Sequence, residues 1–268
     1  MRPLVLLVAV LCTVPAEAKL PGRIAVSIDA HRASRLYQRA VEGWNDAFRI
    51  EELAQITDEI RAVGPKGLSG KTVDRLKTLR KHGAILRASF VSLAAPHEAP
   101  PVLDELVTEF GKLNDAIDHH VHDEAIDRAA RLGQLLEAQP IAALERELAA
   151  FVPASRTSFD RHVATTLGDV RARIQQSPLP AREFHEVRKS LKAVLAVLHL
   201  LTLDPDASAD VREAYDHLNA VNDELGKRHD DAVGRGLRGK DRYKKIEIEI
   251  PPHLRETVDK LAARFQNI

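Results

Sequence analysis

FHEVRKSLKAVLAVLHLL, residues 184–201, is the stretch that decides the fold expected of this chain. Apolar residues recur in it at the three- and four-residue spacing that gives an α-helix one face for burial: Phe184, Val187, Leu191, Val194, Leu195 and Leu198. The other face is basic and begins with a histidine: His185, Arg188, Lys189 and Lys192. Because a solvated helix face usually mixes acids with bases, this segment predicts a core helix whose basic face has a role of its own.

The same apolar periodicity along the rest of the chain predicts an all-α fold of about ten helices. Breaks rich in glycine or proline separate them at 64–70 and 177–182, and 234–242 is expected to be a flexible basic linker. The segment 102–136 is expected either as one helix or as two helices that are interrupted near its histidines. The expected helices span 27–63 (one or two), 72–94, 102–136, 141–151, 158–176, 183–203, 209–233 and 253–266.

A short strand is expected after the linker, within the C-terminal segment 237–268. Ile246, Ile248 and Ile250 alternate with two glutamates, and a period of two is typical of a strand. The sequence offers this strand no partner within the chain. It is expected either to lie as an extended edge segment on the helices or to pair with another protein through Ile246–Ile250.

The chain begins with the pattern of a secretory signal peptide. In MRPLVLLVAVLCTVPAEAKLPG (1–22), Arg2 precedes a short apolar run, and the small residues Ala16 and Ala18 follow it. We expect a signal peptide at 1–18, cut after Ala18, and a periplasmic or secreted protein without a membrane span after cleavage. An uncleaved anchor and a lipoprotein at Cys12 are the alternatives.

The charge balance and the missing motifs narrow the function. Lys+Arg and Asp+Glu number 39 each, so nothing in the net charge predicts binding to nucleic acid. No Gly-rich phosphate loop, HExxH or GxSxG motif occurs, and we expect neither an enzyme nor a cofactor. HHVHDEA (119–125) could hold a metal, but a polar helix face is the preferred interpretation, so no metal site is predicted.

An internal repeat is visible in two pairs of segments. VDRLKTLRKHGAIL (73–86) aligns without gaps on FHEVRKSLKAVLAV (184–197), and FGKLNDAI (110–117) aligns on LGKRHDDA (225–232). Lys77 then falls on Arg188 and Lys81 on Lys192, whereas Asp74 replaces His185. Chance similarity of amphipathic helices is the alternative. Two motifs in the same order at nearly equal spacing favour a duplicated helical bundle with pseudo-two-fold symmetry.

FHEVRKSLK and LGKRHDDAV, with the weaker VDRLKTLRK and FGKLNDAI, resemble the motifs of the CHAD domain, a duplicated α-helical domain named for its histidines. The resemblance covers about residues 27–236, in halves of about 27–136 and 141–236. It implies two helical bundles around a central basic cavity. It also implies that the domain binds inorganic polyphosphate or a similar polyanion without catalysis.

The basic positions of both halves are the candidate ligand contacts, because a polyanion needs cations in a row on a rigid surface. They are Lys77, Lys81, Lys112, His185, Arg188, Lys189, Lys192 and Lys227. Asp230 is expected to orient His185 and make it more basic, and Asp115 to hold Lys77 or Lys81. Ion pairs between helices and a solvated face are the structural alternatives. The alternative function is that of a periplasmic structural or adaptor protein that uses its helical scaffold and C-terminal tail for protein contacts.

Overall fold

A computed structural model describes residues 26, 28–204, 207–237 and 243–265. The expected signal peptide, with its cut after Ala18, lies outside the described residues. Among the described residues, no helix is both long and apolar enough to cross a membrane.

The fold is all-α, as the periodicity predicts. The described residues form ten α-helices, a 3₁₀ turn and two very short strands. The helices are α1 (Ala30–Ala47), α2 (Ile50–Gly67), α3 (Gly70–Leu93), α4 (Pro101–Asp118), α5 (His122–Leu135), α6 (Ala138–Ala149), α7 (Arg156–Ile174), α8 (Ala181–Thr202), α9 (Ala209–Leu237) and α10 (Pro252–Phe265). The other elements are β1 (Leu179–Pro180), η1 (Tyr243–Lys245) and β2 (Glu247–Ile248).

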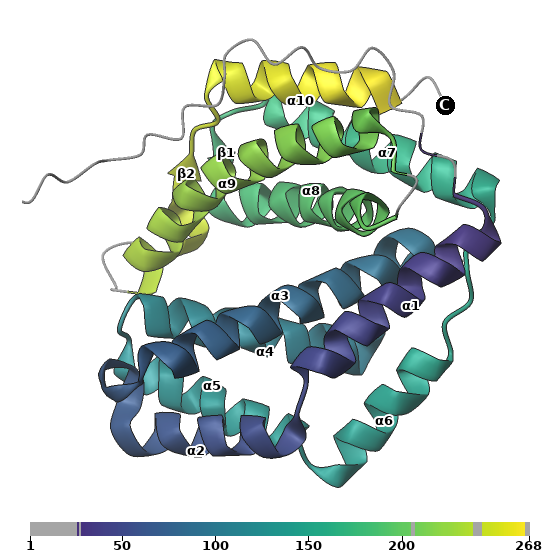
Figure 1. Cartoon of the computed structure of the whole chain (residues 1–268). Coiled ribbons are helices and arrows are strands. Elements are labelled where there is room, and N and C mark those ends of the chain that lie inside the picture. The colour runs from purple at the N-terminus through teal and green to yellow at the C-terminus, as the bar shows by residue number, and fades with distance from the viewer. Residues whose placement is uncertain (1–25, 27, 205–206, 238–242, 266–268) are drawn as a thin grey trace, which may run out of the picture.

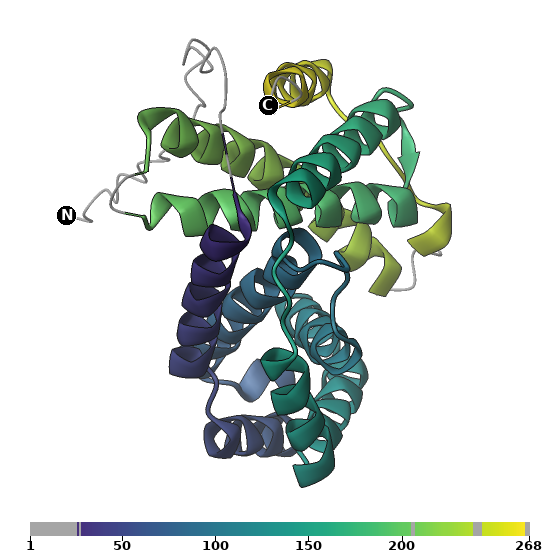
Figure 2. The same ribbon diagram turned by 90° about the vertical axis from the view of Figure 1, so that its right-hand side faces the viewer.

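The helices form two groups, which lie one above the other in Figure 1. Helices α1–α6 make the lower group, and α7–α10 make the upper group, as the turned view in Figure 2 also shows. Helix α3 packs against α1 and α4, and α8 packs against α9 and α7. The groups meet chiefly where α8 packs against α3.

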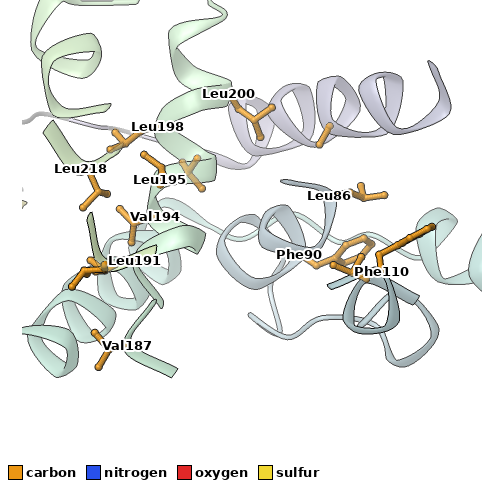
Figure 3. Close-up of a cluster of buried hydrophobic side chains, with 14 of the residues drawn as sticks. Leu86, Phe90, Phe110, Val187, Leu191, Val194, Leu195, Leu198, Leu200 and Leu218 are labelled. Carbon is orange, nitrogen blue, oxygen red and sulfur yellow. The ribbon is translucent and has the colours of Figure 1, made fainter. Parts of the chain in front are cut away.

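The predicted apolar face of 184–201 is the core face of α8. All six of its members are buried, and Phe184 and Leu191 are fully inaccessible. In Figure 3, side chains from Val187 to Leu198 line up along α8, whereas Leu86, Phe90 and Phe110 gather in the core of the other group. Burying such side chains contributes about 1.5–3 kcal/mol each, which orients α8 and leaves Glu186 and Lys189 exposed.

Small side chains mark the contact between the two groups. Ala88 of α3 and Ala193 and Ala196 of α8 form a separate buried cluster there, with Val91 packed beside it. The hydroxyl of Ser92 donates to the carbonyl oxygen of Ala193 over 3.5 Å. Because the distance between two packed helices depends on the side chains at their contact, alanines allow α3 and α8 to approach closely.

The helix breaks follow local chemistry. The Ser69 hydroxyl accepts a hydrogen bond from the Thr72 amide over 3.1 Å and so begins α3. The segment 102–136 is two helices, which confirms the interruption near the histidines; His120, with a φ of 56°, lies in that turn. Gly64 has a φ of 67°, and a Cβ there would lie 2.4 Å from the His122 ring, so only glycine fits.

The strand does have a partner within the chain, so the expectation that it has none was wrong. β2 pairs antiparallel with β1, with Ile248 opposite Leu179. Ile246, Ile248 and Ile250 are buried in the main core, and the amide of Ile250 donates to the Ser177 hydroxyl over 2.7 Å. Helix α9 also continues to Leu237, into the expected linker, while 238–242 lie outside the described residues.

Replacing Ile250 with alanine tests how firmly the tail is docked. Ile250 is 1% exposed, so Ile250→Ala should lower the free energy of unfolding by ~2–5 kcal/mol, through lost burial and a cavity. Glu249→Ala, at the exposed neighbouring position, is the matched control and should change stability little. Denaturant unfolding measures both, and equal stability of the two variants would contradict the docked tail.

Candidate functional site

A cleft of about 640 Å³ lies where α3 and α8 meet. Its lining contains one carboxylate, that of Glu186, and six cationic side chains from the two helices. The six are Lys77, Arg80, Lys81, Arg87, Lys189 and Lys192. In a chain of zero formal net charge, this cleft is therefore a local concentration of positive charge.

Helix geometry brings these cations together. On α3, Lys77, Lys81 and Ala84 follow each other at three- and four-residue spacing, so that they share one face. The cleft-lining part of α3 from Lys77 to Val91 extends over ~20 Å at the usual rise per residue. On α8, burial of the apolar face fixes the direction of Lys189 and Lys192. Basic residues that are more than a hundred positions apart thereby face one space.

Four of the cations have a carboxylate nearby. Nitrogen–oxygen distances are 3.1 Å for Lys77–Asp118, 3.3 Å for Arg80–Asp115, 3.2 Å for Arg87–Asp104 and 3.7 Å for Lys189–Glu186. Each pair keeps substantial solvent exposure, so that such a pair contributes only ~0–1 kcal/mol. Lys81 and Lys192 have no hydrogen-bond or ion-pair partner among the described residues.

Lys192 is half-buried, and its charge is not compensated locally. Burial, reinforced by the positive charges of Arg188 and Arg80, lowers the pKa of Lys192 to about 8. A group in this state gains from a bound anion, because an opposite charge nearby favours its protonated form. Lys192 is therefore a cation of the cleft whose charged form a bound anion would stabilise.

Arg188 lies inside the protein rather than in the cleft lining. Its side chain packs between α8 and α9, and a Cβ at Gly226 would lie 3.1 Å from its Nη2, so that glycine makes room for the guanidinium. Arg188 is 8% exposed. Its Nη1 lies 3.9 Å from Asp230, and its Nε has no hydrogen-bond partner among the described residues. Asp230 is largely exposed, so it is the packing of the buried guanidinium against Gly226 that gives Arg188 a structural role between α8 and α9.

Two histidines form a chain with Asp230. His229 Nδ1 lies 3.2 Å from Asp230 Oδ1, and His229 Nε2 lies 2.9 Å from His185 Nδ1. A carboxylate only accepts hydrogen bonds, so His229 donates from Nδ1 to Asp230. His229 Nε2 and His185 Nδ1 share a second hydrogen bond, which links the two rings. The Tyr243 hydroxyl, which donates to the Ala181 carbonyl oxygen over 3.3 Å, closes this cluster on the C-terminal side.

Asp230 was expected to orient His185 and raise its pKa, and the structure contradicts both expectations. Asp230 contacts His229 and not His185, so it orients His185 only indirectly. Burial, together with His229 and the nearby cations, lowers the pKa of His185 to about 4 instead of making it more basic. At Asp230 burial acts to raise the pKa, but the His229 hydrogen bond and the Arg188 charge outweigh it, and the net pKa is lowered.

Asp115 was expected to hold Lys77 or Lys81, but it has a different partner. Asp115 pairs with Arg80, and Lys77 pairs with Asp118. Arg80–Asp115 joins α3 to α4 as Arg188–Asp230 joins α8 to α9. In these contacts Arg80, rather than Lys77, is the counterpart of Arg188. Burial raises the pKa of Asp115 despite the charge of Arg80.

The cleft brings together half of the predicted ligand contacts. Lys77, Lys81, Lys189 and Lys192 line it, whereas the remaining four positions do not. His185 and Arg188 are held in the cluster described above. Lys112 lies 2.7 Å from Glu109 on α4. Lys227 lines a separate groove between α9 and β2, where Glu224 and Asp231 accompany it.

Sequence reasoning missed Arg80, Arg87 and His229. The ungapped alignment placed Arg80 on the core position Leu191, so its charge was not counted with the basic face. A signal was present, because Arg80 lies three residues after Lys77 and Arg87 seven after Arg80, on the same side of a helix. His229 stands directly before Asp230, inside the quoted motif, but was not assigned a role.

The geometry defines an all-α protein with a basic cleft between helices. The CHAD domain family matches residues 84–239, more than half of the chain, and the chain belongs to this family. No significant match was found among curated proteins or solved structures. Within the part of the chain that the structure describes, no group of three or more His, Cys, Asp or Glu side chains is placed to hold a metal ion.

The depressed pKa of His185 predicts how stability depends on pH. Its pKa is 6.5 for an ordinary histidine and about 4 in the fold. Between these values the unfolded chain binds a proton that the folded chain does not, so stability rises with pH across this range and is lost as pH falls. His185 should contribute up to ~3 kcal/mol to the difference in unfolding free energy between pH 4 and pH 7.

Denaturant unfolding of His185→Gln at the two pH values checks this. The variant should show a smaller loss of stability at the lower pH than the unmodified protein. His31→Gln, at an exposed histidine on α1, is the control and should keep the full loss. The same loss in His185→Gln as in the control would contradict the buried neutral state of His185.

Proposed function

We propose that this protein binds inorganic polyphosphate or a similar polyanion in the cleft between α3 and α8, without catalysis. The observation that carries the proposal is the sixfold excess of cationic over acidic side chains in the cleft lining. Membership of the CHAD domain family supports the same ligand class. The signal-like start of the sequence supports action in the periplasm or outside the cell.

The arrangement of the cations suits a chain of phosphates. Negative charges recur along such a chain, and the two helices offer cations from both sides of one space. Arginine forks bind phosphate oxygens in pairs, whereas lysines act as point charges. The ion pairs of Lys77, Arg80, Arg87 and Lys189 are partly exposed, so a phosphate chain can compete with their carboxylates. Lys81 and Lys192 need no such exchange.

The adaptor alternative has less support. It relies on Ile246–Ile250 as a strand offered to another protein. The three isoleucines are buried in this chain, and β2 already pairs with β1 along one edge. A polyanion-binding cleft therefore accounts for more of the described features than a strand-exchange surface does.

Removing the two unpaired lysines tests the site. Lys81→Ala/Lys192→Ala should weaken binding of polyphosphate at least tenfold, because it deletes the cations that have no internal partner. Titration calorimetry at about 50 mM and about 200 mM salt should also show a shallower salt dependence for the variant, since fewer counterions are exchanged. Replacing the buried Arg188 would not test the cleft alone, because its loss would also disturb the packing of α8 on α9.

The matched control is Lys66→Ala/Lys71→Ala, which removes the same charge from exposed positions outside the cleft. It should retain nearly the affinity and salt dependence of the unmodified protein. Equal weakening by both double variants would show that binding depends on overall charge and not on this cleft. Absence of binding at the lower salt concentration would overturn the proposed function.

The pKa of Lys192 predicts a second signature. Because this pKa is about 8 in the free protein, raising the pH from about 7 to about 9 deprotonates Lys192. A bound anion stabilises the protonated form, so this change weakens binding. Affinity should then fall about tenfold across this range. In Lys192→Arg the charge persists, because arginine is not deprotonated in proteins, so the fall should largely vanish. The ligand's own titration is common to both proteins, and an equal fall in both would contradict the role of Lys192.

A further inference from the structure

The cleft has a second wall that a bare phosphate chain does not require. Helix α9 contributes Tyr215, Asn219 and Asn222 at four- and three-residue spacing, and α8 contributes His199 opposite them. None of these four side chains carries the positive charge that a lysine carries at neutral pH. Together they form a part of the cleft with aromatic and amide character, distinct from the part that binds anions.

The pairing of α8 with α9 places this wall relative to the cations. His185 contacts His229, Arg188 contacts Gly226, and the ring of His199 lies 5.4 Å from that of Tyr215. These contacts define an antiparallel register in which Lys192 lies level with Asn222. His199 follows Lys192 by seven residues, ~10 Å along the helix axis. The cleft therefore runs from Lys192 and Asn222 at one level to His199 and Tyr215 at the other.

Asn222 is a buried amide with an unmet hydrogen bond. It is 9% exposed and lines the cleft, and its Oδ1 has no hydrogen-bond partner among the described residues. Buried polar groups are nearly always satisfied, since an unsatisfied one costs about 1–3 kcal/mol. Because Oδ1 only accepts hydrogen bonds, this amide, level with Lys192, is suited to a hydroxyl donor of a ligand rather than to a phosphate.

Tyr215 and His199 offer a stacking surface at the other level. Both rings are half-buried, and they are tilted by 33° to each other. Burial, with the charges of Lys81 and His82, lowers the pKa of His199, so that the ring stays neutral near pH 7. Asn219, between the two levels, donates to Asp223 over 3.3 Å and keeps its carbonyl oxygen free to accept a hydrogen bond.

We propose that the ligand of this cleft is a nucleoside polyphosphate. Its phosphates lie among Arg80, Lys81 and Lys192, its sugar lies beside Asn222, and its base stacks at Tyr215 and His199. This inference rests on the proposed function, because it uses the same cations, and it narrows the ligand from any polyanion to one with a planar group. The cleft volume of about 640 Å³ falls within the range of small-molecule sites.

Two other ligand types fit the wall less well. A bare phosphate chain leaves Asn222 unsatisfied and places charge against two neutral rings. A phosphate with an alkyl tail would bury the amides of Asn219 and Asn222 against hydrocarbon, which is costly without hydrogen bonds. A base and a sugar satisfy both amides and both rings.

The affinity of the purified protein for three probes is measured by calorimetry in the absence of magnesium. The probes are adenosine triphosphate, sodium tripolyphosphate and dodecyl phosphate. Adenosine triphosphate should bind at least about tenfold more tightly than tripolyphosphate, since stacking of a base on an aromatic side chain supplies such a factor. Tripolyphosphate carries the higher charge, so electrostatics alone predicts the reverse order. Tyr215→Leu and Asn222→Leu should each reduce the preference while leaving tripolyphosphate affinity unchanged, and Tyr215→Phe should retain it.

The outcomes separate this inference from the proposed function. Tripolyphosphate binding that equals or exceeds adenosine triphosphate binding overturns the nucleotide and leaves the polyanion site standing. If dodecyl phosphate binds most tightly of the three probes, the proposal of a nucleotide ligand is likewise overturned. No binding of any probe overturns both proposals. Unchanged tripolyphosphate affinity in the variants shows in the same experiment that they are folded.

Discussion

The close contact of α3 with α8 is the constraint on which the rest of the structure depends. Alanines at Ala88, Ala193 and Ala196 let the two helices approach, and each helix is anchored in its own group by a separate apolar face. A large side chain at this contact would part the two groups. The basic residues of α3 and α8 would then face solvent separately instead of sharing one cleft.

Charged residues near this contact divide into two kinds. Arg188, His185 and His229 are buried or half-buried, with Asp230 at their edge, and they hold α8 to α9 in a fixed register. Lys81 and Lys192 have no such partners among the described residues, and their charges are directed to the cleft. The buried residues determine where the lysines of α8 point, because Arg188 and its neighbours hold this helix in place against α9.

The sequence predicted most of the fold, because apolar periodicity is a local property. It found the helices, the interruption near His120 and the core face of α8. It did not find the partner of β2, since Leu179 and Pro180 form too short a segment to show a strand pattern. It also could not distinguish the buried Arg188 from the exposed Lys189, because both follow the same charge pattern. Their difference arises from the approach of α9 at Gly226. The internal duplication stays a prediction, with Arg80 and Arg188 as the residues whose contacts are most alike.

The zero formal net charge of the chain has a consequence for how an anion arrives. A protein with an excess of positive charge attracts anions from all directions and over about a Debye length. Here the positive cleft is balanced by acids elsewhere on the same molecule, so that its field falls off with distance as that of a dipole rather than of a charge. An approaching anion is drawn in only when it is already near the mouth of the cleft and on the correct side. For the proposed polyanion ligand, this favours capture at the cleft over binding elsewhere on the surface, with a slower first encounter.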